Sequence, residues 1–332
     1  MRKLLSTIAV VLGFISSVYA QSPKDIGLRT ITEQAARAHI EFLADDELQG
    51  REAGYPGGRI AAAYIQSRLK ELGLKPFLGT TYEQPFQAYR EHYQLAGRWQ
   101  VKPSEIERIK KQTHLCLSMK NILAVLPGQT DELVIVGAHY DHLGMQYGLV
   151  ADSIYNGADD NASGVSAVLQ IAKAFSLSGV VPKRTIVFAF WDGEEKGLLG
   201  SKYFVQSFSD LSRIKSYLNF DMIGRNNKPD QPKHVVYFYT ESQPQFEQWL
   251  KEDLASYALD IEPEIKAWDK PISGSDNASF AQENIPIIWY HTDGHPDYHQ
   301  PSDEPQYLNW EKVVAISKAA YLNVWKMAHE DY

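Results

Sequence analysis

The side chains most able to perform chemistry are acids and histidines that stand where apolar runs end. In the stretch LVIVGAHYDHLG, an apolar run that begins at Leu133 ends before His139, and Asp141 follows two residues later. A glycine-rich turn, NGADDNASG, then carries Asp159 and Asp160. Imidazole and carboxylate groups both bind zinc, and a carboxylate behind a histidine can orient its ring. This stretch therefore predicts a metal site at the end of a strand.

Three further apolar runs end in the same way. In open α/β sheets, sites form outside the carboxyl ends of the strands. We therefore expect the polar residues that follow these runs to meet His139 in one crevice, with Asp160 at the mouth of the next helix. Residues 185–190 lead to Glu194 and Glu195, residues 217–220 lead to Asp221, and residues 286–290 lead to a loop with His291, His295 and His299.

This set of side chains offers carboxylates and imidazoles but no thiolates. Such a set is typical of a catalytic site and favours a two-zinc hydrolase over a structural zinc. Two metal ions about 3.5–4 Å apart need a bridging carboxylate. The reaction also needs a nearby carboxylate that is not a ligand and accepts the proton of the attacking water. The adjacent residues Glu194 and Glu195 suit this division, one facing the substrate and the other a metal.

The elements that must position these residues alternate between strands and helices. The pattern predicts one α/β domain with helices on both faces of the sheet, and the continuous apolar run 185–190 indicates a strand buried on both faces. Expected strands are residues 121–126, 133–138, 185–190, 217–220, 235–239 and 286–290. Expected helices are residues 32–43, 58–72 with Ile60 inward, 162–177, 198–208, 244–254 and 310–328, with a flexible lead-in at 21–30 and a loop or short helix at 104–112.

The first 20 residues, MRKLLSTIAVVLGFISSVYA, have the three parts of a secretory signal peptide. A basic start and an apolar middle too short to span a membrane precede a small-residue cleavage site after Ala20. We therefore expect a periplasmic or secreted protein, with residues 21–332 as one catalytic domain and no membrane contact after cleavage.

Charge and cysteine content exclude several classes of protein. Without Arg2 and Lys3 the mature chain has 31 basic and 41 acidic residues, a net charge of −10, which argues against nucleic-acid binding. The one cysteine, Cys116, allows no intramolecular disulfide and no thiolate cluster for zinc. We expect Cys116 to be a small buried hydrophobic residue.

Five motifs together resemble the co-catalytic di-zinc exopeptidases of peptidase clan MH. They are GAHYDHLG, NGADDNASGVSAVL, DGEEKGLLGS, NFDMIG and HPDYHQPSDE, and a weaker match extends to LADDELQGREAGYPGG from Leu43. The group includes aminopeptidases, glutamate carboxypeptidases and zinc-dependent glutaminyl cyclases. The resemblance implies the zinc exopeptidase fold, in which a mixed, mostly parallel central sheet is sandwiched by helices.

The resemblance also implies a role for each residue that matches a motif. His139 and Asp221 would bind one Zn²⁺, Glu195 and His299 the other, and Asp160 would bridge them. Asp141 would support His139, and Glu194 would be the general base and then the general acid. The family pattern further implies a cis peptide bond between Asp160 and Asn161.

Several alternatives stay open within these motifs. Asp159 and Asp160 are adjacent, so spacing alone hardly shows which of them is the bridging ligand. The position of Asp160 four residues before Gly164 favours Asp160. His291 and His295 fit loop or pocket-rim positions better than ligand positions, and His142 fits local packing or hydrogen bonding. Relatives often have Ser-Asp-His where this chain has Ser-Asp-Asn at Asn277, which concerns the substrate pocket rather than the metals.

The resemblance thus implies a metallo-aminopeptidase with two Zn²⁺ per chain that acts on peptides with a free N-terminus. In that activity a zinc-activated water attacks the scissile carbonyl with Glu194 as general base. The alternatives are a glutaminyl cyclase on the same fold and a glutamate-type carboxypeptidase, which would want clustered basic residues at its pocket. The sequence does not define the oligomeric state or the native metal.

Overall fold

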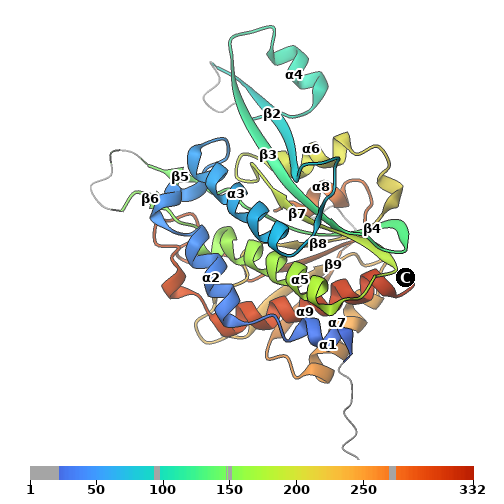
Figure 1. The fold of residues 1–332 in the computed structure, drawn as a ribbon. Coiled ribbons are helices and arrows are strands. Elements are labelled where there is room, and N and C mark those ends of the chain that lie inside the picture. Colours follow the sequence, from blue (N-terminus) through green and yellow to red (C-terminus); the bar gives the residue numbers. More distant parts are fainter. Residues whose placement is uncertain (1–21, 93–97, 147, 149–151, 269–273) are drawn as a thin grey trace, which may run out of the picture.

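The described residues share one large mixed sheet, which is parallel at its centre (Figure 1). The computed structural model describes residues 22–92, 98–146, 148, 152–268 and 274–332. The expected signal peptide lies outside these residues. No helix in the described part combines the length and apolar character needed to cross a membrane.

The central strands β7, β4, β8 and β11 pair in parallel, so their carboxyl ends lie at one edge of the sheet. Antiparallel pairing of β3 with β7 and of β9 with β11 makes the sheet mixed, as expected. In spatial order the strands are β1 (Lys75–Pro76), β3 (His114–Leu126), β7 (Arg184–Trp191), β4 (Thr130–His139), β8 (Ile214–Phe220), β11 (Ile287–His291), β9 (His234–Tyr239) and β10 (Glu262–Ala267), with β2 (Glu83–Glu91) paired to β3. Two short strands, β5 (Gly144–Met145) and β6 (Ile154–Tyr155), form a separate ribbon.

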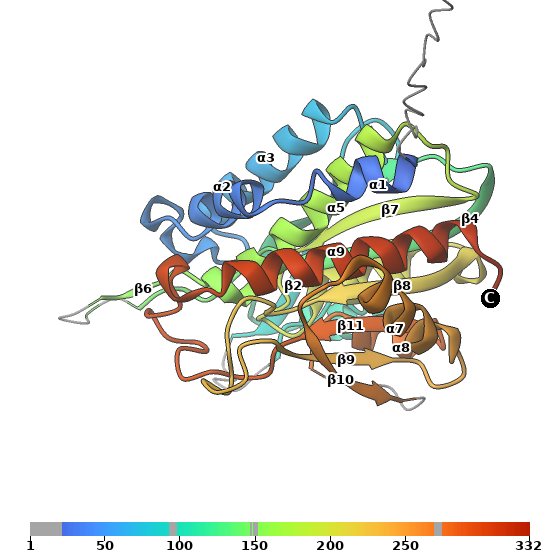
Figure 2. The ribbon, with the colours of Figure 1, turned by 90° about the horizontal axis from the view of Figure 1, so that it is seen from below.

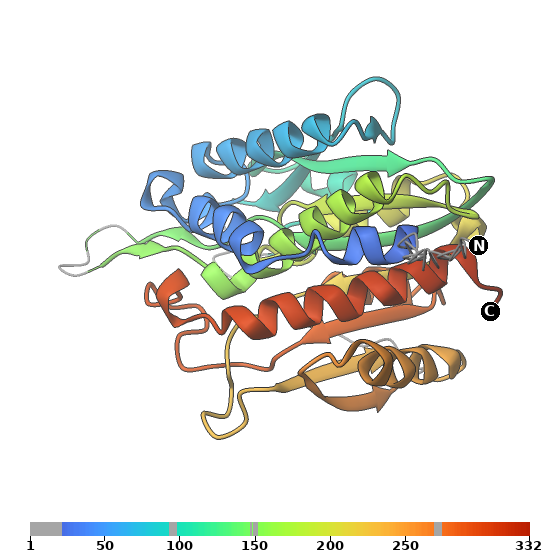
Figure 3. The same cartoon turned by 60° about the horizontal axis from the view of Figure 1, so that its bottom comes forward.

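Helices cover both faces of this sheet. Figures 2 and 3 show α1, α2, α3, α5 and α9 together on one face, and α7 packs against α9. On the other face, α6 packs against β7, and α8 packs against β8 and β11. The helices are α1 (Pro23–Leu28), α2 (Glu33–Leu43), α3 (Pro56–Glu71), α4 (Pro103–Ile109), α5 (Gly164–Ser178), α6 (Leu199–Ser207), α7 (Gln245–Tyr257), α8 (Asn277–Ala281) and α9 (Trp310–His329), with short 3₁₀ turns at Asp46–Arg51, Leu211–Arg213 and Pro305–Tyr307.

Strand β7 explains why two helical layers are needed. Because side chains alternate along a strand, its continuous apolar sequence presents buried groups to both faces. Ile186, Phe188 and Phe190 belong to the core beneath α5 and α9. Val187 and Trp191 belong to the core beneath α6 and α8. The expectation that this strand is buried on both faces is confirmed.

Three expectations about local structure are wrong. Residues 23–28 form α1 instead of a flexible lead-in, because the Ser22 hydroxyl accepts the N–H of Asp25 and Gly27 packs closely against Tyr321. Ile60 is 44% exposed, because α3 turns its small residues Ala61 and Ala62 toward the core.

Cys116 is exposed instead of buried. It lies on the part of β3 that pairs with β2, where the ribbon extends past the main helical layer (Figure 1). On this ribbon Met119 points inward and is buried, while Cys116 lies on the solvent side.

A close contact at Gly57 positions the turn before α3. A Cβ atom built on Gly57 lies 1.7 Å from the carbonyl oxygen of Leu48 and 3.2 Å from the Cα of Arg51. Helix α3 therefore approaches the 3₁₀ turn at a distance that only glycine allows. This approach fixes the position of Arg51.

We predict that Gly57→Ala destabilises the protein by about 3 kcal/mol, because overpacking against backbone atoms forces the turn to move. Urea unfolding followed by circular dichroism measures the change. Gly294→Ala is the matched control, because a Cβ atom there meets nothing within 4 Å, and it should change stability little. Equal stabilities of the two variants would contradict the close contact.

Candidate metal centre

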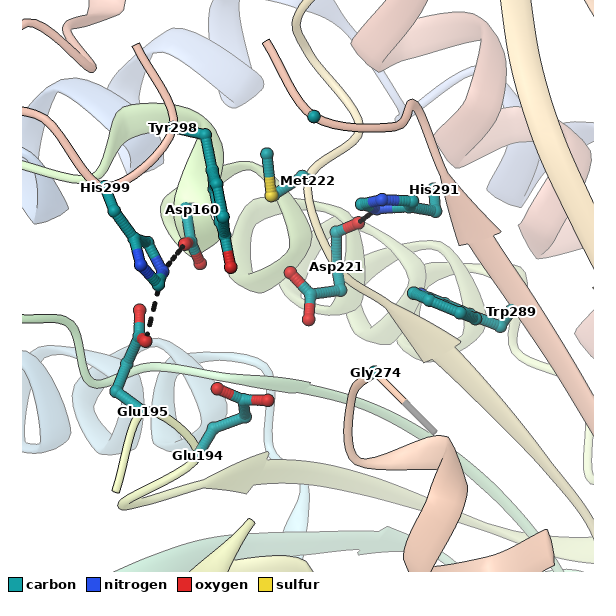
Figure 4. Close-up of a pocket in the computed structure, with 11 residues that line it drawn as sticks. Asp160, Glu194, Glu195, Asp221, Met222, Gly274, Trp289, His291, Tyr298 and His299 are labelled. Carbon is teal, nitrogen blue, oxygen red and sulfur yellow. Dashed lines mark hydrogen bonds and ion pairs between the residues drawn. The ribbon is translucent and has the colours of Figure 1, made fainter. Parts of the chain in front are cut away.

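The carboxyl edge of the parallel strands brings the expected polar residues together. His139 is the last residue of β4, and Asp221 directly follows β8. Glu194 and Glu195 follow β7 after a short turn, and His299 lies in the loop after β11. Asp160 lies in the turn that precedes α5. Figure 4 shows Asp160, Glu194, Glu195, Asp221 and His299 around one pocket.

Two groups of potential metal ligands overlap at Asp160. In the first group, Nε2 of His139 lies 3.3 Å from Oδ1 of Asp160 and 3.5 Å from Oδ1 of Asp221. In the second group, His142, Asp160 and Glu195 have ligand atoms within 4.8 Å of one another. Asp160 is the member that both groups share. Its two carboxylate oxygens face different groups, as a bridging ligand requires.

His299 completes the second group from the opposite wall. Its Nε2 lies 3.2 Å from Oδ2 of Asp160 and 3.2 Å from Oε2 of Glu195. His142 contacts the same glutamate, and its Nδ1 donates to Oε1 of Glu195 at 2.7 Å. His142 thus bonds to a candidate ligand 53 residues away and belongs to one of the ligand groups, instead of bonding only locally as expected.

Asp141 supports the site through its backbone as well as its side chain. Nδ1 of His139 donates to the carbonyl oxygen of Asp141 at 3.1 Å, while the carboxylate is 3.8 Å from the same nitrogen. This bond places a proton on Nδ1, so Nε2 is the nitrogen that faces Asp160 and Asp221 and that could bind a metal ion. The Asp141 carboxylate accepts the backbone N–H of Glu194 at 3.0 Å and so holds the glutamate turn.

The metal-free site is dominated by buried negative charge. Burial lowers the pKa of His139, but the charges of Asp221 and Glu194 outweigh burial and hold the pKa well above its usual range. Burial likewise opposes protonation of His299, whose hydrogen bonds to Asp160 and Glu195 raise its pKa to about 10. Burial raises the pKa of Glu194 well above its usual range, and the neighbouring carboxylates add to that effect. The site therefore attracts cations, whether protons or metal ions.

Arg51 is a buried cation next to this site, and no sequence motif predicted a role for it. Its side chain is fully buried, and all three guanidinium nitrogens donate to backbone carbonyl oxygens. Two of these bonds, at 2.6 and 2.9 Å, hold the turn that presents Asp160. The five acceptors are the carbonyl groups of Leu43, Tyr140, Asn156, Gly157 and Asp160.

Two more buried polar residues fix the same turn. The Asp303 carboxylate accepts the N–H groups of Asp159 at 3.1 Å and Asp160 at 3.0 Å. Asn161 donates from Nδ2 to the carbonyl oxygen of Phe220 at 2.9 Å, so it ties the turn to the end of β8. The peptide bond between Asp160 and Asn161 is cis, as the resemblance implied. Asp303 lies in the motif HPDYHQPSDE, but its spacing gave no indication of this contact.

The neighbouring candidates have other partners. Asp159 turns away from both ligand groups, and its oxygens accept the N–H groups of Gly224 at 2.6 Å and Arg225 at 3.2 Å. His295 is buried 3.4 Å from the Asp159 carboxylate. His291 lines the pocket, and its Nδ1 donates to the carbonyl oxygen of Asp221 at 2.5 Å.

The pocket at this centre is small, with a volume of about 210 Å³. Trp289, Met222 and Tyr298 form its apolar walls, and the carboxylates lie at its base (Figure 4). Asp276, of the Ser-Asp-Asn stretch, is buried nearby, and burial raises its pKa to about 7. The pocket can hold one side chain next to the ligand groups.

Comparison with known proteins identifies the family. Residues 121–324 match the model of peptidase family M28. The chain belongs to this family. The matched segment runs from β3 to α9 and includes the ligand groups at the carboxyl edge of the sheet. Membership of M28 confirms the resemblance to zinc exopeptidases that the five motifs indicated.

Curated relatives of the chain include an enzyme named for inactivating leupeptin and a probable leucine aminopeptidase. Leupeptin-inactivating enzyme 1 of Streptomyces exfoliatus is 34% identical over 172 residues, which is 50% of this chain and 34% of that protein. A probable leucine aminopeptidase of Trichophyton verrucosum is 27% identical over 225 residues, which is 65% of this chain and 58% of that protein. This chain thus spans about a third and somewhat over half of the lengths of these two relatives.

Solved structures with the same fold include peptidases and a cyclase. The LapA aminopeptidase of Legionella pneumophila matches with a TM-score of 0.68 at 22% identity, covering 100% of this chain and 81% of that one. BSAP, a zinc aminopeptidase from Bacillus subtilis, matches with a TM-score of 0.68 at 16% identity, over 90% of this chain and 96% of that one. A glutaminyl cyclase from Fimbriiglobus ruber gives 0.67 at 15% identity, over 89% and 95%. These likenesses confirm the fold class.

We predict that Arg51→Met destabilises the protein by about 3 kcal/mol or more, because it leaves buried carbonyl groups without donors and removes a cation from a buried acidic site. Urea unfolding measures the loss. Arg59→Met is the control, because Arg59 is on the surface and donates to a single carbonyl group, that of Gly54. If Arg51→Met were as stable as Arg59→Met, Arg51 would not hold the Asp160 turn.

Proposed function

We propose that this protein is a metallo-aminopeptidase that removes N-terminal residues from peptides and holds two Zn²⁺ ions, with Asp160 between them. The observation that carries the proposal is the overlap of two buried ligand groups at one carboxylate. Membership of family M28 supports a peptidase, and the names of its relatives favour an aminopeptidase.

The donor set fits a pair of zinc ions. It offers imidazole nitrogens and carboxylate oxygens without sulfur, as catalytic zinc sites with an open position do. The crowded carboxylates raise the pKa of His139 and His299, so the site favours cations strongly. His139 and Asp221 would hold one ion, Glu195 and His299 the other, and Asp160 both. Nδ1 of His142 lies 2.7 Å from Oε1 of Glu195, and this hydrogen bond would orient the Glu195 carboxylate.

The zinc ions and the side chains would have different roles in the reaction. When bound, a pair of zinc ions polarises the scissile carbonyl group and lowers the pKa of the attacking water. Glu194 lines the pocket beside the ligand groups, and its N–H bond to Asp141 fixes its backbone. Its carboxylate accepts the proton of the attacking water and then delivers it to the leaving amine. Adjacent Glu195 remains with the ligand group.

We also propose that the mature protein begins after Ala20 and acts in the periplasm or outside the cell. The support is the sequence of residues 1–20, with its basic start, apolar middle and small-residue end.

A glutaminyl cyclase is the second candidate. The favouring observation is a cyclase structure that matches the fold as closely as the aminopeptidases do, with a TM-score of 0.67 against 0.68. The two activities give different products from one substrate.

The deciding experiment is a mass spectrum of the products from a peptide that begins Gln-Leu, incubated with the zinc-loaded protein. We expect loss of the N-terminal glutamine by hydrolysis. Loss of ammonia with the chain intact would instead establish a cyclase and contradict the proposal.

We predict that Glu194→Gln retains zinc but lowers kcat about 10²–10⁴-fold, because an amide cannot accept the proton. Zinc content by elemental analysis and the rate of leucine release measure the two effects. Glu241→Gln, a substitution at an exposed glutamate beyond β9, is the matched control and should retain both. If Glu194→Gln lost zinc in proportion to activity, Glu194 would be a ligand and the roles of the two adjacent glutamates would be exchanged.

A further inference from the structure

A second cavity, of about 560 Å³, opens beside the metal centre. Glu195 lines both cavities, so they adjoin at this candidate ligand. The second cavity lies between the segment that leads into α4 and the start of α6. Its lining residues include Arg98, Trp99, Val101, Lys102, Lys196, Leu199 and Lys202.

Four cations line this cavity in a chain whose net charge is −8. Nζ of Lys196 pairs with Oε1 of Glu52 at 2.7 Å. Within the described residues, no carboxylate forms an ion pair with Arg98, Lys102 or Lys202. The lining of the cavity therefore carries four cations against one carboxylate, that of Glu195. These cations come from segments about 100 residues apart, so they do not form a cluster in the sequence.

Lys202 interacts electrostatically with acidic residues of the metal pocket. Burial lowers its pKa and nearby Arg98 lowers it further, while the charges of Asp276 and Glu194 raise it. Its Nζ also donates to the carbonyl oxygen of Gly197 at 2.9 Å. Lys202 thus lies between the basic cavity and the acidic base of the metal pocket, where a bound anion would favour its charged form.

The wall opposite α6 is held in place by ordinary strand and core contacts. Gln100 and Tyr89 exchange backbone hydrogen bonds at 2.9 and 3.0 Å. Val101 is buried and belongs to one apolar cluster with Leu199 of α6. The two sides of the cavity therefore share a packed base and form a built groove.

We propose that this basic groove binds the free C-terminal carboxylate of a short peptide whose N-terminal residue lies in the metal pocket. The inference rests on the proposed aminopeptidase function and names its substrate class as dipeptides and tripeptides. The metal pocket, of about 210 Å³, holds one side chain, so the rest of the substrate must leave through an adjoining space. The groove is that space, and its volume suits a small ligand fragment.

The chemistry of the groove matches a carboxylate. Lysine and arginine form charge-assisted hydrogen bonds with carboxylate oxygens, and Lys102 and Lys202 approach from opposite sides. In a long peptide the backbone amides bring no such charge to the groove. A carboxylate on the side chain of the second residue offers the same chemistry, so the test must separate the two sources.

The test compares kcat/KM of the zinc-loaded protein for Leu-Ala and for Leu-Ala-amide, which differ only in the terminal carboxylate. We expect a preference for Leu-Ala of about tenfold, mostly in KM, as a partly exposed charged hydrogen bond would give. In Lys202→Gln and in Lys102→Gln this ratio should fall to about two or less. Lys318→Gln, on α9 in a different surface pocket, should retain the full ratio.

Leu-Glu-amide and Leu-Gln-amide test the other source of the carboxylate. Equal rates for this pair support binding of the terminal carboxylate, whereas faster cleavage of Leu-Glu-amide by about tenfold would assign the groove to an acidic side chain and overturn the proposal. Equal rates for Leu-Ala and Leu-Ala-amide would also overturn it and leave the aminopeptidase intact. Cleavage of none of these substrates would remove the proposed function and the groove assignment together. If Lys202→Gln unfolds, Lys102→Gln still tests the proposal, because Lys102 is exposed and its substitution should not disturb folding.

Discussion

The structure depends on holding several carboxylates close together in a buried place. Asp160 is 2% exposed and lies within 3.8 Å of three histidines. Like charges in such a site repel one another and resist burial, so they need compensation. Part of it comes from Arg51, whose charge lies behind the Asp160 turn. The rest must come from protons on the histidines or from metal ions in front of the turn.

This constraint accounts for the position of distant parts of the chain. Arg51 reaches the site only because α3 packs against the 3₁₀ turn at Gly57. Asp303 brings the last loop against the Asp159–Asp160 backbone, and the same loop carries His299. The parallel centre of the sheet aligns the ends of β4, β7 and β8 at this point. The fold thus places several of the candidate ligands at or just after strand ends and supports the buried turn before α5 from behind.

Much of the fold and the composition of the site could be predicted from the sequence, because both depend on local patterns. The continuous apolar sequence of residues 185–190 indicated burial on both faces. The grouping of the acids that follow the strands could be predicted, because parallel strands end at one edge of the sheet. Arg51 could not be assigned a role, because its partners are backbone carbonyl groups that leave no sequence signal. The basic groove was also missed, because Lys102 and Lys202 line one cavity only once the segment between β2 and β3 lies beside α6. The predictions that Cys116 and Ile60 are buried were wrong, because burial on a ribbon or a helix depends on which of its faces the neighbouring elements cover.

The central claim is that one carboxylate, Asp160, serves two metal ions. Native mass spectrometry of the zinc-loaded protein tests it by counting ions in the wild type, Asp160→Asn and Asp159→Asn. The account predicts two ions in the wild type, two in Asp159→Asn, whose amide oxygen can still accept the N–H of Gly224, and at most one in Asp160→Asn. Two ions retained in Asp160→Asn would contradict a shared ligand, and the two groups would then be independent sites.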